Sequence, residues 1–511
     1  MGSMVLSAIL LAGVTGCGDS SSTCEDSNTT TPVASTEDTS DIKDTNSSEN
    51  SLKSLISGLE TASATAVTAS LVDVAEDDKI PFGDGSFSPF ERVAILDVVY
   101  DANGSVDYEA TNKKANDIAT KIALSVANVN EPKEDNATFK ASDWIVIDKK
   151  KVGDVNLTDE DIKHHIIHIP TSKPWNPTKP YSASNTNKVH LVELCNPLYA
   201  AQAVGNKIVG GEEGANVPNG TYHATALPCE VTVYSDNQAI YVDMLNPETI
   251  FTLFFTDVFS HDVMKNEKFK TAMMALPTQV KKEVTALIHN SLDMQGETYT
   301  KTAIKMGPIY SSFSKAMQVP EKGAPYTHFN YTGDKEYSIA DAKAIALEIM
   351  KVMTIHGEEN AGTQDEPLLS SLPSMSQDKA VQPKWRSARE EPFKIPGGVW
   401  VIEACSPVYA KEALNTGEYH TPALPCEVAV NVNPDNNNSI NVAILNPDFM
   451  FNALFSDGMA KMSSEEITAF QVIIDNINGD LSTMVDYAIE HKVEGLDHAT
   501  KKELTPIDYS K

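Results

Sequence analysis

The sequence predicts an α/β protein of the α+β kind: two tandem copies of a small sheet packed with helices, preceded by a disordered tether. Three sequence blocks occur twice in the same order, and short apolar runs within them alternate with helical patterns. A Ser-, Thr- and Asp-rich segment precedes both copies. We expect a signal peptide over 1–16, the tether over 17–82, the first unit over 83–296 and the second over 297–511.

The N-terminus has the pattern of a lipoprotein signal. Residues 4–14 form an apolar run, and Val14-Thr15-Gly16-Cys17 follows it. Small residues before a single cysteine resemble the bacterial lipobox, which implies a lipid on the Cys17 sulfur and anchoring in the cell envelope, at the outer membrane or the periplasmic face. No Lys or Arg precedes Cys17, although such signals usually begin with positive charge. A segment that is only cleaved, or that stays as an anchor, is the alternative.

Composition excludes several classes of function. The chain has 71 acidic and 40 basic residues, a formal net charge of -31. Such a charge argues against nucleic-acid binding and against electrostatic docking on anionic lipid. No apolar run of about 18 residues follows the N-terminus, which excludes a polytopic membrane protein.

The duplicated blocks organise the rest of the chain. Residues 193–200 match 403–410, residues 222–231 match 419–428, and Leu-Asn-Pro at 245–247 matches 445–447. The offsets are 210, 197 and 200, so the first copy has a longer, Gly-rich connection over 203–220. Trp175 and Trp385 each lie 18 residues before the first block. We read them as counterparts in the core, with a pocket wall as the alternative.

Local chemistry predicts the elements of each copy. The apolar runs 190–194 and 399–404 predict strands, and Asn-Pro or Ser-Pro directly after them predicts a capped helix start. Alternating Val and central turn residues predict hairpins, 226–234 with 239–245 and 423–432 with 439–445. The Asn-Pro pairs at 246 and 446 begin further helices, followed by long helices over 267–292 and 464–491. Upstream, we expect a strand over 92–100, a helix over 108–129 and a matching helix over 338–355.

The blocks resemble the bacterial family called domain of unknown function 302. The resemblance rests on E-x-C-[NS]-P, A-L-P-C-E-V-x-V and L-N-P, and it covers 175–257 and 385–457. It implies a compact α/β domain that often forms dimers, and it implies no reaction. Two copies in one chain then suggest an intramolecular pseudo-dimer.

The paired cysteines are the sharpest candidate site. Cys195 and Cys405 end strands ahead of helix N-termini, where the dipole favours a thiolate, and Cys229 and Cys426 begin strands. Three interpretations stay open: an intradomain disulfide, buried unreactive thiols, or a thiol-redox, metal or haem-ligating site. The resemblance argues against the disulfide, because cytosolic relatives keep cysteines reduced.

Histidines and glutamates near these cysteines complete the candidate site. His223 and His420 lie six residues before the second cysteine, where imidazole and thiolate could share a soft metal such as Cu or Zn. The alternative is an exposed loop histidine bonded to backbone. Glu193 and Glu403 share a strand face with the cysteine two residues on. We expect the other two glutamates, Glu230 and Glu427, to be solvent-facing or paired.

The remaining patterns favour a binding or interaction module over an enzyme. The histidines at 164, 165 and 168 resemble a metal cluster, but no acid or cysteine completes it and the second copy lacks it. The sequence contains no G-x-S-x-G, no H-E-x-x-H and no Walker loop. We therefore expect a lipid-anchored envelope protein that binds an unidentified small ligand or envelope protein. The alternative is a periplasmic protein of thiol-redox, metal or haem chemistry.

Overall fold

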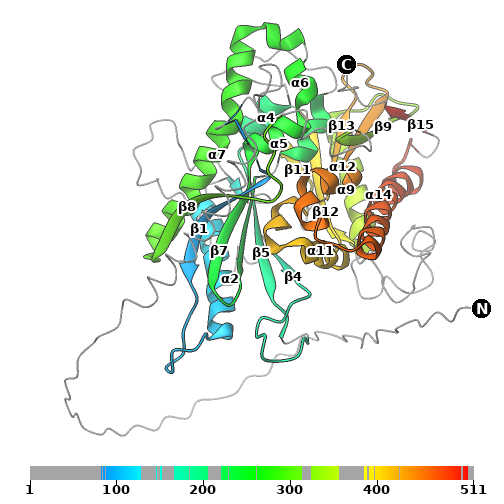
Figure 1. Ribbon diagram of the computed structural model, residues 1–511. Helices are drawn as coiled ribbons and strands as arrows, with labels where there is room; N and C mark the ends of the chain where they lie inside the picture. Colours follow the sequence, from blue (N-terminus) through cyan, green and yellow to red (C-terminus); the bar gives the residue numbers. More distant parts are fainter. Residues whose placement is uncertain are drawn as a thin grey trace, which may run out of the picture.

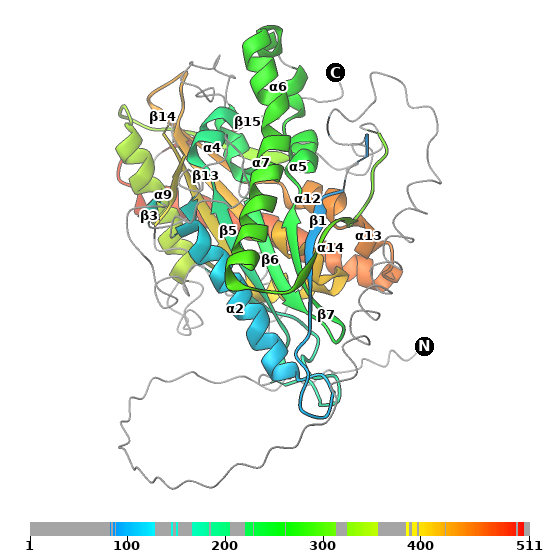
Figure 2. The ribbon, with the colours of Figure 1, turned by 90° about the vertical axis from the view of Figure 1, so that its left-hand side faces the viewer.

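The computed structural model describes residues 82, 85–86, 88–127, 145–146, 150–151, 166–182, 185–204, 220–227, 229–260, 262–312, 324–355, 385–387, 391–395, 398–424, 426–496 and 499–504. These residues form two units, each an antiparallel sheet covered by helices, which confirms the predicted fold class. The first unit lies on the left in Figure 1 and the second on the right. Figure 2 shows α2 (Tyr108–Ala127) and α7 (Glu267–Gln295) over the near face of the first sheet, with the second unit on its far side.

The first sheet has the strand order β3-β2-β5-β6-β7-β1-β8, and β4 pairs with β5 beside this path. Its strands are β1 (Phe90–Asp97), β2 (Ile145–Val146), β3 (Lys150–Lys151), β4 (Ile166–Pro170), β5 (Lys188–Cys195), β6 (Cys229–Ser235), β7 (Ala239–Leu245) and β8 (Tyr299–Met306). Shorter helices connect them: α4 (Pro197–Ala203), the 3₁₀ helix η5 (Gly220–Ala226), α5 (Pro247–Phe254), α6 (Thr256–Ser260) and the 3₁₀ helix η6 (Asp262–Lys265).

The second sheet has the order β10-β12-β13-β14-β9-β15, and β11 pairs with β12. Its strands are β9 (Tyr326–Thr332), β10 (Arg386–Ser387), β11 (Phe393–Ile395), β12 (Val399–Cys405), β13 (Cys426–Val432), β14 (Ser439–Leu445) and β15 (Thr500–Leu504). Its helices are α9 (Ile339–Ile355), α11 (Pro407–Ala413), η9 (Leu414–Thr416), η10 (Glu418–Ala423), α12 (Pro447–Leu454), α13 (Ser456–Met459) and α14 (Ser464–Lys492).

Local capping fixes the strand-to-helix turns, as the sequence predicts. The side chain of Asn246 accepts a hydrogen bond from the backbone N–H of Glu248 at 3.2 Å, and Asn446 accepts one from Asp448 at 3.0 Å. Ser406 caps α11 in the same way. A proline follows each cap at the first helical position, where its missing N–H is not needed.

The first unit extends beyond the division expected at residue 296. β8 lies antiparallel to β1 from Leu96↔Tyr299 to Phe90↔Met306, so it belongs to the first sheet. β15 pairs with β9 in the same way in the second sheet. Both strands lie at an edge of their sheet and contain lysines, and β15 has only one apolar residue, so the pattern of apolar runs did not predict them.

Strand register shows that Trp175 and Trp385 are not counterparts, although each lies 18 residues before the first repeated block. Trp385 precedes β10, whose Arg386 pairs with Cys405. In the first unit the residue opposite Cys195 is Ile145, and in the sequence Trp144 precedes it. The register therefore aligns Ile145, rather than a residue after Trp175, with Arg386.

The two tryptophans of the original match also differ in environment. Trp385 is buried, and its indole N–H donates to Asp480 at 2.9 Å. Trp175 follows β4 and is half-buried, with its ring 6.3 Å from that of Tyr108. The prediction of a core tryptophan is confirmed for Trp385 and is wrong for Trp175.

The two units pack against each other through their 3₁₀ segments. η5 lies on β12, β13 and β14 of the second sheet, and η10 lies on β5, β6 and β7 of the first. The first residue of β1, Phe90, meets the ring of His420 edge-on at 5.2 Å. Its counterpart in β9, Tyr326, meets Tyr222 at 4.9 Å. The contact between the units is thus reciprocal.

Several predictions fall outside the described residues. They concern the signal peptide, Cys17, the tether, residues 205–219 of the long connection, and His164 and His165. Within the described ranges, no helix combines the length and the apolar character that crossing a bilayer requires.

Candidate functional site

The repeated Tyr-His pair of the first unit is fastened to the start of α6. His223 Nε2 lies 2.8 Å from a carboxylate oxygen of Asp257, and its Nδ1 lies 2.8 Å from the carbonyl oxygen of Gly220. The Tyr222 hydroxyl donates to the other carboxylate oxygen. The imidazole is fully buried and stacks on Phe255 with ring centroids 4.5 Å apart. Because both ring nitrogens face acceptors, the geometry fits an imidazolium paired with Asp257.

The second unit repeats this arrangement, but its aspartate is more exposed and lies further from the histidine. His420 Nε2 lies 3.1 Å from Asp457, Tyr419 donates to the same carboxylate, and Nδ1 lies 2.7 Å from the Thr416 hydroxyl. The Asp457 side chain is 22% exposed, against 1% for Asp257. Burial lowers the pKa of His420, against the opposing effect of Asp457.

These contacts argue against the prediction that the two histidines bind a metal ion. His223 and His420 use both ring nitrogens within their own networks, so no nitrogen is left to share a metal with Cys229 or Cys426. Within the described residues, no group of three or more His, Cys, Asp and Glu side chains is arranged to hold a metal ion. The histidines position η5 and η10. The alternative of an exposed loop histidine is wrong for His223, which is fully buried, although its Nδ1 does lie against the Gly220 carbonyl oxygen.

The four glutamates of the repeated blocks lie in the contact between the sheets. Glu193 stands opposite Glu230 across β5 and β6, and Glu403 stands opposite Glu427 across β12 and β13. All four are only 2–3% exposed. Burial and then the charge of Glu403 raise the pKa of Glu230. A solvent-facing position for Glu230 and Glu427 is therefore wrong, because the opposite unit covers that sheet face.

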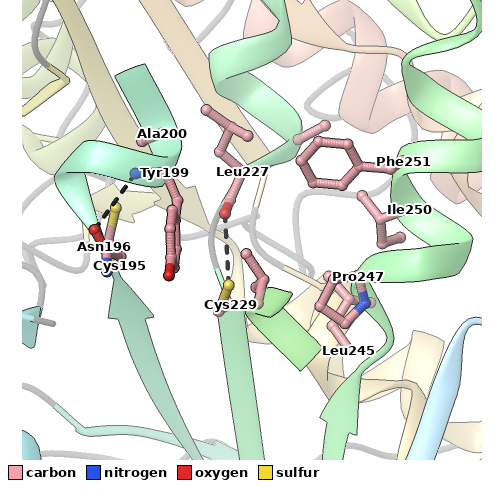
Figure 3. A pocket seen from close by; sticks show the side chains of 12 residues that line it. Cys195, Asn196, Tyr199, Ala200, Leu227, Cys229, Leu245, Pro247, Ile250 and Phe251 are labelled. Atoms are coloured by element: carbon pink, nitrogen blue, oxygen red, sulfur yellow. Dashed lines mark hydrogen bonds between the residues drawn. The ribbon is translucent and has the colours of Figure 1, made fainter. Parts of the chain in front are cut away.

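Both first-unit cysteines line one cavity. It encloses about 450 Å³, open space at its mouth included, between β5, β6, α4 and α5. Figure 3 shows Cys195 and Cys229 at the ends of neighbouring strands, with Ile250 and Phe251 of α5 across from Cys229. Val280 of α7 also lines it. We call this the thiol cavity.

The thiols of the cavity are neutral. Burial, the neighbouring Cys229, Glu427 and Glu403 all raise the pKa of Cys195. Burial and the charge of Glu230 raise that of Cys229. The expected activation of Cys195 by the helix N-terminus is wrong, because loss of hydration outweighs the dipole. In the described part of the chain, Cys195, Cys229, Cys405 and Cys426 form no disulfide.

The matching region of the second unit has different side chains at some of these positions. Met450 occupies the position of Ile250, and Ile477 occupies that of Val280. Cys426 is buried, whereas Cys229 is half-buried. Burial also raises the pKa of Cys426.

One member of the histidine-rich segment has a partner that the sequence did not suggest. His168 of β4 stands opposite His190 of β5, with the two Nδ1 atoms 2.8 Å apart. Burial lowers the pKa of both, that of His190 to about 3. The second unit has Lys394 opposite Trp400 at this place, a cation–π pair at 5.7 Å.

The first sheet also contains a buried ion pair that the sequence analysis missed. Arg92 Nε donates to Asp243 at 2.8 Å, its guanidinium lies 3.7 Å from the Tyr241 ring centroid, and the Tyr234 hydroxyl donates to Asp243 at 2.8 Å. All face the second unit. The signal in the sequence was a basic residue in one largely apolar strand, Arg92, and an acidic residue in another, Asp243.

Comparison with known proteins found no matching family model, curated protein or solved structure. The resemblance to domain of unknown function 302 accordingly stays a prediction.

Proposed function

We propose that this protein is a ligand-binding module of the cell envelope whose site is the thiol cavity. The ligand class is a small, uncharged, mainly apolar molecule. The supporting observation is the cavity itself, because its walls are mostly apolar, as the walls of most small-molecule sites are.

The lining supports an uncharged ligand. Ten of the twelve lining residues are aliphatic, aromatic, proline or neutral cysteine, and Asn196 and Tyr199 are the two others. The Tyr199 hydroxyl donates to Glu283 at 2.6 Å. A charged ligand would lose its hydration without a counter-charge, which is unfavourable. One polar group of the ligand can align with Asn196 or Tyr199.

Indole tests the proposal, because it is small and neutral and has a single N–H donor. Calorimetric titration of the full chain is expected to give one site per chain. Val280→Phe fills the cavity and should weaken binding at least tenfold, and the milder Val280→Ile should weaken it less. The matched control is Ile477→Phe at the equivalent position of the second unit, which should leave the affinity unchanged. Absence of indole binding, or equal losses in V280F and I477F, would contradict the site.

We propose in addition that Cys17 anchors the chain by a lipid and that the packing of the units replaces a dimer of single units. Support comes from the apolar run before Cys17 and from the reciprocal contacts of η5 and η10.

Two experiments test these proposals. A clickable fatty acid should label the full chain in bacteria, and Cys17→Ala should abolish the label and membrane retention. Light scattering should give a monomer; an obligate dimer would count against the second part.

A thiol-redox role is the second candidate, because Cys195 and Cys229 line the same cavity. Their raised pKa values make it the weaker one, since the thiolate is the reactive form. Intact mass with and without reductant, together with metal analysis, separates the candidates. A reversible first-unit disulfide favours redox chemistry. Unchanged mass and no metal favour binding.

A further inference from the structure

We propose that a second cavity, between the two units, binds a small alkylammonium ion. This boundary cavity encloses about 350 Å³, open space included. Its walls come from equivalent positions of both units. The residues that carry the argument are Glu230 and Glu427, Leu245 and Leu445, and Ile250 and Met450.

Glu230 is the observation that points to a ligand. Its side chain is 3% exposed, and within the described residues its Oε2 atom has no hydrogen-bond partner. It lines the cavity together with Glu427, which is 2% exposed. Natural proteins rarely leave a buried carboxylate oxygen without a partner, because desolvation is costly. A cation in the cavity would supply that partner.

The chemistry of the walls selects the kind of cation. Two carboxylates repel anions. They also offer fewer oxygen ligands than the six or more that Ca²⁺ takes. An ammonium group has three N–H donors, enough to reach both carboxylates. Leu245, Leu445 and Ile250 then provide apolar surface for a short alkyl chain.

Ammonium binding should exchange one proton. Burial and the charge of Glu403 raise the pKa of Glu230, so in the empty cavity this carboxyl holds a proton. The other titratable groups near it are Glu193 on β5, Glu427 on β13 and Cys229 on its own strand. When the ammonium ion binds, the Glu230 proton goes to solvent and the carboxylate pairs with the cation. Affinity should therefore increase with pH.

Titration calorimetry of the full chain with n-butylammonium chloride tests this, with n-butanol as the neutral control. We expect one site per chain, at least tenfold tighter at pH 8 than at pH 6, and a heat that varies with the buffer because a proton is released. Glu230→Gln should weaken binding at least tenfold. Glu297→Gln makes the same substitution outside the cavity and should have no effect.

Three results would overturn the proposal: no butylammonium binding at either pH, butanol binding as tightly, or unchanged affinity in E230Q. If E230Q does not fold, Glu427→Gln serves the same purpose. V280F should leave butylammonium binding intact. This separates the boundary cavity from the thiol cavity, so either proposal can fail without the other.

Discussion

The two units share one order of elements but differ on the sheet faces that meet. In the first, Arg92 and Asp243 pair across β1 and β7. At the equivalent register of β9 and β14, the second has His328 and Ala443. The Tyr-His-Asp network and the opposed glutamates occur in both. Duplication thus kept the residues that hold the units together.

Comparison of the two units shows which positions have changed since the duplication. The Arg92 position differs although it lies beside a Tyr-His-Asp network, since the ring of its counterpart His328 lies 5.2 Å from that of Tyr222. The pair of His168 and His190 differs on β4 and β5. The lining of the thiol cavity differs too, through the branched Ile250 and its longer, unbranched counterpart Met450. Variants at these positions test whether each difference affects only its own part of the molecule.

The largest effect is expected at the ion pair. Asp243→Ala leaves the buried Arg92 guanidinium without its carboxylate and should lower the free energy of unfolding by about 3–5 kcal/mol. Urea denaturation measures this. Adding Arg92→His to Asp243→Ala installs the residue types of the second unit and should restore most of the loss, because no charge is then stranded. A double variant as unstable as the single one would mean that the sheet faces are not interchangeable.

The Tyr-His-Asp networks should respond unequally. Asp257→Asn removes a buried charged acceptor and should cost about 2–3 kcal/mol, whereas the more exposed Asp457→Asn should cost about 1 kcal/mol. Although burial opposes it, the charge and hydrogen bond of His223 lower the pKa of Asp257 below that of the unfolded chain. This contribution is therefore present above about pH 4 and is lost as the pH falls further. Urea titrations of both variants at pH 7 and pH 3 measure this. Equal losses of unfolding free energy at pH 7 would contradict the predicted difference between the two networks.

The histidine pair should make the first unit locally sensitive to acid. His168 and His190 have folded-state pKa values below the unfolded value of about 6.5, so protonation favours opening. Their stability contribution is complete above that value and declines as the pH falls, by up to about 1.4 kcal/mol per pH unit for each histidine. Hydrogen exchange, corrected for intrinsic rates, should show β4 opening more at pH 5 than at pH 7, with β11 unchanged. His190→Phe should reduce the response to the part that His168 contributes, and an equal response of β11 would refute the prediction.

The smallest effect is expected at the rim between the units. Lys173 Nζ lies 2.6 Å from Glu418, but its side chain is 56% exposed. Lys173→Ala should cost about 0.2–1 kcal/mol, and less at high salt. Denaturation at low and high salt checks this, and a loss above 2 kcal/mol would show that the rim contributes more than exposed pairs do.

Local chemistry predicted the hairpins, the capped helices and the long helices, because Asn-Pro caps and alternating Val are short-range signals. It did not predict β9, whose polar His328 and Asn330 face the other unit. The cysteines were recognised, but their shared cavity depends on where α5 packs. The burial of Glu230 depends on a unit that begins about 100 residues further along the chain. Such contacts leave no local pattern.

The most direct test of the account is a crystal structure of the full chain soaked with indole. Indole is expected in the thiol cavity of the first unit, between Cys229 and Val280, and not in the matching region of the second unit, where Met450 and Ile477 replace Ile250 and Val280. Indole bound equally in both units, or only outside the thiol cavity, would contradict it.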